Sequence, residues 1–275
     1  IFIKDSDGSV YNEMVKTGML HSYVPKDIGE KMKPEFREPL FSPYLEMKQV
    51  FYNDEVYDTS PIDSWWDLTR PEYKGKVMIQ NPLSTPENQG LFLAMIQNAD
   101  DMEKAYKEEF GEDIVLNGTE NAGYEFVKRL MENGLIFTDS DTEIIEAIGA
   151  EGQTNPPFGI VTSSKMREKF SKGYKLAVVE NIKPKDGVIA PASLLIVDNA
   201  PHVNVAKLLI RWIAGEADGK GPGLKPFLAP GSWPTRSDVE PENTPPLDSL
   251  RLWDFDLDFN YQNINELRDF LFTLL

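Results

Sequence analysis

The stretch that decides the fold is residues 77–88, which read VMIQNPLSTPEN. Its first residues form a short apolar run with the length of a buried strand, and a loop of Asn, Pro and hydroxyl side chains follows. Ser84 or Thr85 then stands at the N-cap position of a helix, and Pro86 suits the first helical turn. An apolar stripe follows at Leu91, Phe92, Met95 and Ile96. The stretch therefore predicts strand, polar loop and helix, the repeating unit of an α/β protein.

The same succession of strand, polar loop and helix is expected elsewhere in the chain. The run Ile1–Ile3 leads into the polar loop Lys4–Ser9 and then into a helical pattern, and the loop Thr138–Thr142 precedes a helix with apolar residues at Ile144, Ile145 and Ile148. In open α/β sheets such loops point N–H groups and helix dipoles into the ligand crevice. Their hydroxyl and carboxylate side chains also cap helices, so capping is the alternative interpretation of these residues.

Composition limits the classes of partner. The 275 residues include 45 acidic and 28 basic side chains, and the net charge of −17 argues against nucleic acid as a partner. There is no cysteine, and the two histidines, His21 and His202, argue against structural zinc. A metal site would have to be built from oxygen ligands. The length favours two lobes over one core.

Catalytic motifs are absent from the sequence. None of G-x-S-x-G, the P-loop, H-E-x-x-H and G-x-G-x-x-G occurs. His21 is predicted to lie in a loop after a helix and His202 at a helix entry, and the paired carboxylates fall in polar helical patterns typical of solvated faces. We therefore expect no enzyme, although an α/β enzyme that uses carboxylate chemistry stays open as an alternative.

Short motifs occur in one order along the chain, from about residue 5 to residue 239. They are GML (18–20) with Tyr23 and Pro25, WWDL (65–68), PEYKGKV (71–77), NPLST (81–85), APH (200–202) with Ala206 and Lys207, and PTRSDV (234–239). Each motif alone is only modestly specific, but the order in which all of them occur along the chain is more specific. Together they resemble the extracellular solute-binding proteins of ABC transporters, of the iron(III) or family 1 type.

The resemblance implies an α/β, two-lobed type 2 periplasmic-binding-protein fold, with the ligand in the interlobe cleft and two crossover strands as hinge. The crossings are expected near Met47–Asn53 and Ala192–Val197. Residues 1–51 and 188–275 would form the first lobe, with part of it upstream of residue 1, and 52–187 the second. The tail from Leu252 is expected on the first lobe, and Trp65 and Trp66 are expected in core packing.

The sequence departs from the iron-binding members of this family, which present two adjacent tyrosines to the ferric ion. In this chain the corresponding positions fall within Thr162-Ser163-Ser164-Lys165, so hydroxyls and an ammonium replace phenolates. Such a set suits an oxyanion at a helix start, with helix capping as the alternative. The predicted ligand-binding residues are Asp5, Ser6, Asp7, Ser84, Thr85, Ser140, Asp141, Thr162, Ser163, Ser164 and Lys165.

We therefore expect a receptor that binds a small anionic or polyhydroxylated solute, such as a phosphonate, a sugar phosphate or a carboxylate, by closure of its lobes. No cofactor and no metal are expected. The resemblance implies a monomer that delivers its ligand to the membrane permease of an ABC importer, in the periplasm or outside the cell, with a lipid anchor upstream as one mode of attachment. A receptor of the same fold for ferric iron or another metal is the second interpretation.

Overall fold

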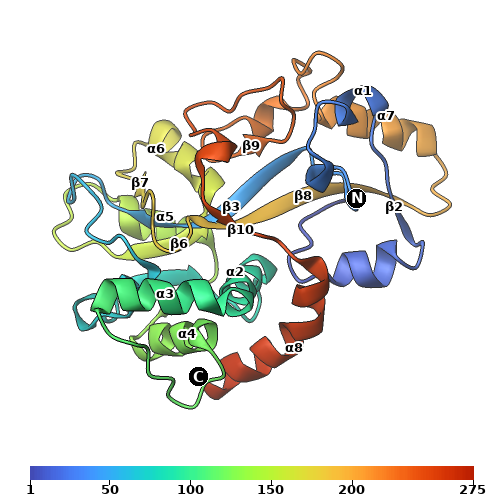
Figure 1. Ribbon diagram of the computed structural model, residues 1–275. Helices are drawn as coiled ribbons and strands as arrows, with labels where there is room; N and C mark the ends of the chain where they lie inside the picture. Colours follow the sequence, from blue (N-terminus) through green and yellow to red (C-terminus); the bar gives the residue numbers. More distant parts are fainter.

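Two long antiparallel strands form the spine of the molecule (Figure 1). The computed structural model describes residues 1–275. Strand β3 (Tyr44–Tyr52) pairs with β8 (Gly187–Val197), with Tyr44 opposite Ala192 and Met47 opposite Ile189. Both strands extend further toward the N-terminus than the predicted crossings. They pass between two lobes, and this two-lobed α/β arrangement is the one expected from the sequence.

The second lobe is built on strands β4 (Val77–Gln80), β5 (Ile136–Thr138) and β6 (Phe158–Thr162), which are parallel to one another. The distal half of β3 joins them antiparallel to β6, so the sheet order is β1-β8-β3-β6-β4-β5. Neighbouring residues of β3 face opposite ways, because Val50 packs in one core cluster and Phe51 in another. The sheet is therefore covered on both faces.

The helices of the second lobe fall into two groups. The larger core cluster holds α2 (Pro86–Gln97), α3 (Ala99–Phe110) and α4 (Ala122–Glu132), together with the fully buried Trp65 and Trp66. The predicted core position of the tryptophan pair is thus confirmed. On the other face lie α5 (Asp141–Gly149) and α6 (Arg167–Lys172). The helix predicted after the loop Thr138–Thr142 corresponds to α5.

The first lobe surrounds β8. Strands β1 (Phe2–Ile3) and β2 (Leu20–Ser22) pair with β8, and β9 (Trp233–Pro234) pairs with β3. Its remaining elements are helices α1 (Lys26–Gly29) and α7 (Val203–Ile213), a π-helix η1 (Val10–Val15), and 3₁₀ turns η2 (Pro34–Phe36), η6 (Lys225–Phe227) and η7 (Leu247–Ser249). The second lobe also contains strand β7 (Ala177–Val178) and 3₁₀ turns η3 (Trp65–Thr69), η4 (Pro71–Tyr73) and η5 (Ser163–Met166).

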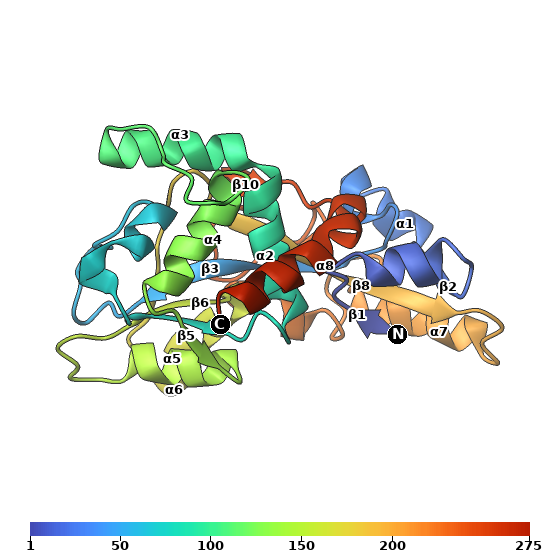
Figure 2. The ribbon, with the colours of Figure 1, turned by 90° about the horizontal axis from the view of Figure 1, so that it is seen from below.

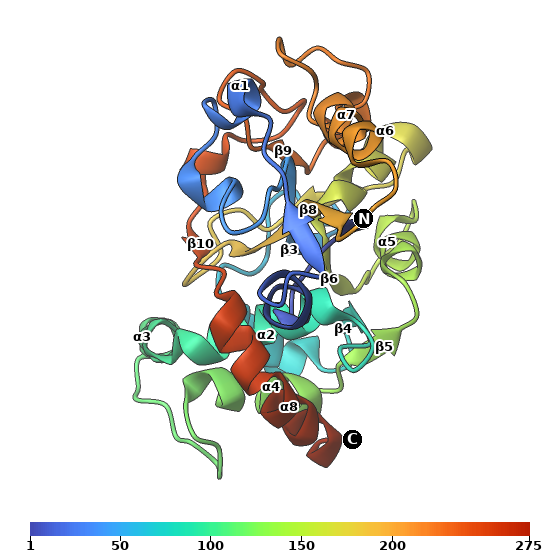
Figure 3. The same ribbon diagram turned by 90° about the vertical axis from the view of Figure 1, so that its right-hand side faces the viewer.

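We expected the C-terminal segment on the first lobe, but mainly the start of its helix contacts that lobe, where Asp258 pairs with Lys16 and Asn260 donates to the carbonyl of Ser6. Strand β10 (Leu252–Trp253) pairs with β8, and helix α8 (Leu257–Thr273) then crosses to α2 and α4 (Figures 2 and 3). Three apolar side chains of α8, spaced three or four residues apart, join the core of the second lobe because they continue the apolar surface of those helices. They are Ile264, Leu267 and Leu271. None of the helices is long and apolar enough to cross a membrane.

Candidate functional site

The polar loops of the second lobe meet at one edge of its sheet. Because β4, β5 and β6 are parallel, their carboxyl ends lie side by side, and each is followed by a helix or turn. Helix α2 begins at Pro86, as predicted, and α5 begins at Asp141. The predicted loops around Ser84, Ser140 and Thr162 are therefore brought to the same edge.

A buried ion pair lies at the centre of this edge. Lys48 of β3 is 2% exposed, and its Nζ lies 3.2 Å from both carboxylate oxygens of Asp141. Burial lowers the pKa of Lys48, against the opposing effect of the Asp141 charge. Burial would raise the pKa of Asp141, but the Lys48 charge and hydrogen bonds from Thr162 outweigh it and lower this pKa. Each group therefore favours the charged form of the other.

Further charged groups extend this pair toward the first lobe. Lys4, directly after β1, bonds through its Nζ to Glu46 of β3 and lies 3.9 Å from Glu87 in the first turn of α2. The charge of Glu87 also acts on Lys48. The cluster of Lys4, Glu46, Lys48, Glu87 and Asp141 thus joins both lobes, and we call it the charged cluster. It offers ammonium donors and carboxylate acceptors in one place.

Thr85 is the predicted residue with an unused polar atom. It is 5% exposed at the N-cap of α2, yet its hydroxyl caps no backbone N–H and has no hydrogen-bond partner. A buried hydroxyl without a partner carries a free-energy cost that a ligand can remove. Its neighbour Ser84 is exposed and donates to the carbonyl of Asn81 at 3.2 Å.

The Asp5–Asp7 loop is fixed largely by its own contacts. Asp5 is buried and accepts hydrogen bonds from the backbone N–H groups of Val10 and Tyr11, at 3.0 and 2.7 Å, and burial raises its pKa despite them. Asp7 accepts from the amide and hydroxyl of Ser9. Ser6 is also buried, and its carbonyl accepts from Asn260 of α8. These side chains anchor the loop against its neighbours.

The residues after β6 separate into different environments. The backbone N–H of Thr162 donates to Asp141 at 2.9 Å, and Lys165 donates to the Thr142 hydroxyl at 2.7 Å and to Glu168 at 3.1 Å. These contacts stay at the sheet edge. Ser164 is buried beside them. Ser140 caps α5 by accepting from Glu143 N–H at 3.3 Å.

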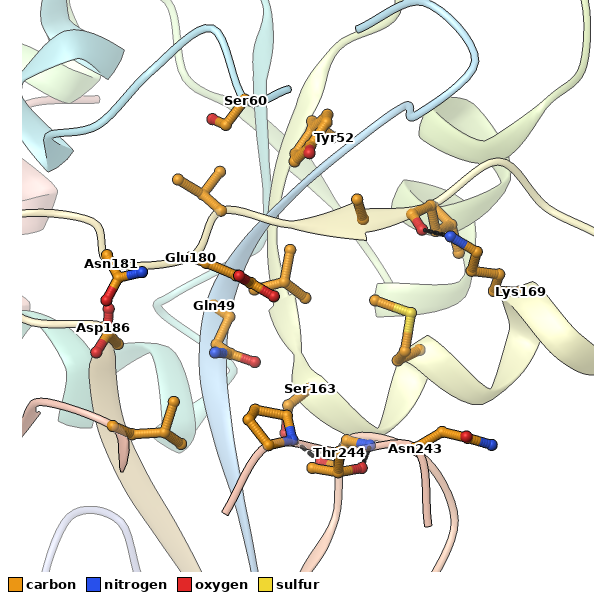
Figure 4. Close-up of a pocket in the computed structure, with 18 of the residues that line it drawn as sticks. Gln49, Tyr52, Ser60, Ser163, Lys169, Glu180, Asn181, Asp186, Asn243 and Thr244 are labelled. Carbon is orange, nitrogen blue, oxygen red and sulfur yellow. Dashed lines mark hydrogen bonds between the residues drawn. The ribbon is translucent and has the colours of Figure 1, made fainter. Parts of the chain in front are cut away.

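Ser163 turns away from this edge. Its hydroxyl accepts a hydrogen bond from the backbone N–H of Met47 at 3.0 Å and donates one to the carbonyl of Gly231 at 2.6 Å. The hydroxyl therefore already has both an acceptor and a donor partner within the protein. It also lines a cavity of about 800 Å³ on the other side of β3 (Figure 4). It is the member of the predicted set found there.

The predicted site residues did not include four members of the charged cluster: Lys4, Glu46, Lys48 and Glu87. A signal existed in β3, where Glu46 and Lys48 interrupt the apolar run from Leu45 to Phe51 at alternate positions. Alternation places both on one face of the strand, and a charged residue that is almost fully buried needs a partner. Sequence alone does not say that the partner of Lys48 is 93 residues away.

Solved structures with the same fold include binding proteins for different ligands. Ferric iron-binding protein A of Mannheimia haemolytica, in an open conformation, is 17% identical with a TM-score of 0.68, over 97% of this chain and 79% of that one. Iron-bound HitA of Pseudomonas aeruginosa is 13% identical with a TM-score of 0.72, over 99% and 81% of the two chains. AfuA of Actinobacillus pleuropneumoniae, with fructose-6-phosphate bound, is 18% identical with a TM-score of 0.66, over 96% and 78%.

The TM-scores show that these proteins share the fold of this chain, and the proteins bind different ligands. No curated protein matches the chain in sequence. The family described as bacterial extracellular solute-binding protein matches residues 9–220, which is most of the chain. Its members are binding proteins and not enzymes. The chain belongs to this family of bacterial extracellular solute-binding proteins.

Proposed function

We propose that the chain is the receptor of an ABC importer for a small polyhydroxylated solute that carries an anionic group, with a sugar phosphate as the best fit. A phosphonate or a carboxylate is the simpler member of the same class. The solute would lie between the Asp5–Asp7 loop and the loops that follow β4, β5 and β6. The observation that carries the proposal is the buried, unpartnered hydroxyl of Thr85 at the start of α2.

The chemistry of the surrounding groups supports this class of solute. A 12-residue helix begins at Pro86, and the N-terminus of a helix favours an anion. Lys4 and Lys48 can add charge-assisted hydrogen bonds to that anion. Glu46, Glu87 and Asp141 are acceptors, and sugar hydroxyls are the donors that such carboxylates bind.

Ferric iron is the second candidate, because ferric-binding proteins share the fold. Against it, hydroxyl and ammonium side chains occupy the Thr162–Lys165 positions that resemble those of the paired tyrosines. A hard ferric ion prefers phenolate and carboxylate oxygens.

Calorimetry with fructose 6-phosphate, fructose, inorganic phosphate, a phosphonate and citrate tests the proposal. We expect the phosphorylated sugar to bind more tightly than fructose or phosphate alone. Thr85→Val removes the hydroxyl with little change in shape, and losing one hydrogen bond to an anion should weaken binding about tenfold or more. Thr273→Val, at the end of α8, is the matched control and should leave binding unchanged.

Visible absorbance with ferric salt separates the two candidates. A coloured complex that a chelator removes, together with no calorimetric heat from any anion or sugar in the panel, would overturn the proposal in favour of iron. Equal binding by the wild type and Thr85→Val would show that the α2 start does not contact the solute.

A further inference from the structure

The cavity of about 800 Å³ lies on the side of β3 away from the charged cluster. Lys48 points to Asp141, whereas the next residue, Gln49, lines the cavity. Met166 of η5 and Lys169 of α6, both from the second lobe, form one wall, and Figure 4 shows Lys169 at the cavity. Trp233 and Leu250, from the first lobe, form part of the other. The space is therefore an interlobe cavity separate from the proposed solute site.

Gln49 is the first observation that points to a ligand. Its side chain is 7% exposed, yet its amide makes no hydrogen bond within the protein. In Figure 4 the amide extends into the open space between Glu180 and Thr244. Because the amide opens onto the cavity, it can both donate to and accept from a bound molecule. The cavity thus presents one polar group with unused hydrogen-bonding capacity.

The charged side chains at the cavity determine which ligand charge it favours. Lys169 is paired with Asp54, and Asp186 is paired with Arg251. Two further carboxylates of the lining, those of Asp58 and Glu180, are exposed and have no ion-pair partner. The cavity therefore carries an excess of negative charge, which disfavours an anion.

Apolar side chains define the shape of the cavity. Trp233 is 2% exposed, and its indole N–H donates to the carbonyl of Pro245 at 2.8 Å, so the ring is held in place as part of the wall. Met166 and Leu250 add aliphatic surface. Tyr52 lies at the end of β3, and burial, with the charges of Asp54 and Glu180, raises its pKa. An aromatic wall near carboxylates suits a cation with an apolar body.

We propose that this cavity binds a small organic cation with an apolar body and a group that hydrogen-bonds to Gln49, at a site distinct from that of the solute in the charged cluster. Its ligand is thus opposite in charge to the one proposed for the first site. The cavity wall comes from both lobes, so a bound cation would contact each of them.

Three probes of the same shape and different charge test the proposal: benzamidinium, benzamide and benzoate, titrated by calorimetry or ligand-observed NMR. We expect benzamidinium to bind at least about tenfold more tightly than benzoate, with benzamide between them. Gln49→Met keeps the volume but removes the amide, and should weaken benzamidinium about three- to tenfold. Glu180→Gln should weaken it about threefold, since the removed charge is exposed.

Glu103→Gln is the matched control, because it removes an exposed carboxylate from α3, away from the cavity. It should leave benzamidinium binding unchanged. Absence of benzamidinium binding, benzoate binding of equal strength, or equal losses in Glu180→Gln and Glu103→Gln would overturn the proposal. If Gln49→Met unfolds, the comparison of the two exposed glutamates decides alone. The solute assay with Thr85→Val is separate, so either proposal can fail without the other.

Discussion

Removing the carboxylate of Asp141 should destabilise the protein strongly. Asp141→Asn leaves the ammonium of Lys48, which is 2% exposed, without its counter-ion. Breaking a buried pair by removing one partner costs about 3–5 kcal/mol, because the remaining charge stays desolvated. We expect a loss of this size at pH 7. Urea unfolding, followed by tryptophan fluorescence, measures it as a lower midpoint at an unchanged slope.

The pH dependence gives the loss a distinctive signature. Burial already lowers the pKa of Lys48 from its ordinary 10.5, and without Asp141 this pKa should fall further. Between the folded pKa and 10.5 the unfolded state binds more protons than the folded state, so stability rises with pH in that window. The deficit of Asp141→Asn should therefore be largest near neutral pH and shrink as the pH approaches 10.

Two variants test whether the buried charge is the cause. Lys48→Met in the Asp141→Asn background removes the unpaired ammonium and should recover at least half of the lost stability. Glu108→Gln breaks an exposed pair with Lys104 and should change stability by no more than about 0.5 kcal/mol. A loss below about 1 kcal/mol in Asp141→Asn, or no recovery in the double variant, would refute the reasoning.

Three further predictions concern stability. Gly231→Ala should cost more than about 2 kcal/mol in urea unfolding, because φ is +84° and the added Cβ would lie 1.9 Å from the Ser163 carbonyl oxygen. Gly111→Ala is the control: φ is +74° there, no atom lies within 4 Å of the added Cβ, and the cost should be about 1 kcal/mol. Burial opposes ionisation of Glu125, but hydrogen bonds to its carboxylate lower its pKa to about 2, so its stabilisation is complete above pH 4.5 and is lost as the pH falls to 2. Glu125→Gln should remove about 3 kcal/mol at pH 7 and flatten the acid limb of the stability curve. Leu267→Ala should cost about 2–5 kcal/mol, and a change below 1 kcal/mol would mean that α8 does not depend on the core of the second lobe.

Local patterns predicted the second lobe well. Pro86 marked the start of α2, because proline lacks the N–H that the first helical turn leaves unpaired. The polar loop before Asp141 marked the start of α5, where the Ser140 side chain accepts from the backbone N–H of Glu143. These features depend on residues within one turn of each other, so the sequence carries them directly.

Contacts between residues far apart in the sequence could not be predicted, because no local pattern describes them. The position of α8 depends on which apolar surface is still free after α2 and α4 have packed, and no local pattern describes that surface. Similarly, Ser163 has the same hydroxyl as Thr85, but Met47 and Gly231 satisfy the first and nothing satisfies the second. A loop sequence predicts where hydroxyls lie and not which of them stays free.

The two proposed sites meet at one point of the backbone. Strand β3 pairs with β8 up to Met47 and with β6 from Lys48 onward, so the chain passes from one lobe to the other between these residues. Lys48 and Gln49, directly after this change of partner, face the two sites in turn because strand residues alternate. A rotation of the lobes is absorbed at such a junction and alters the walls on both sides of β3. Any difference between the lobe positions preferred by the solute and by the cation would therefore appear as coupling between the two affinities, equal in both directions.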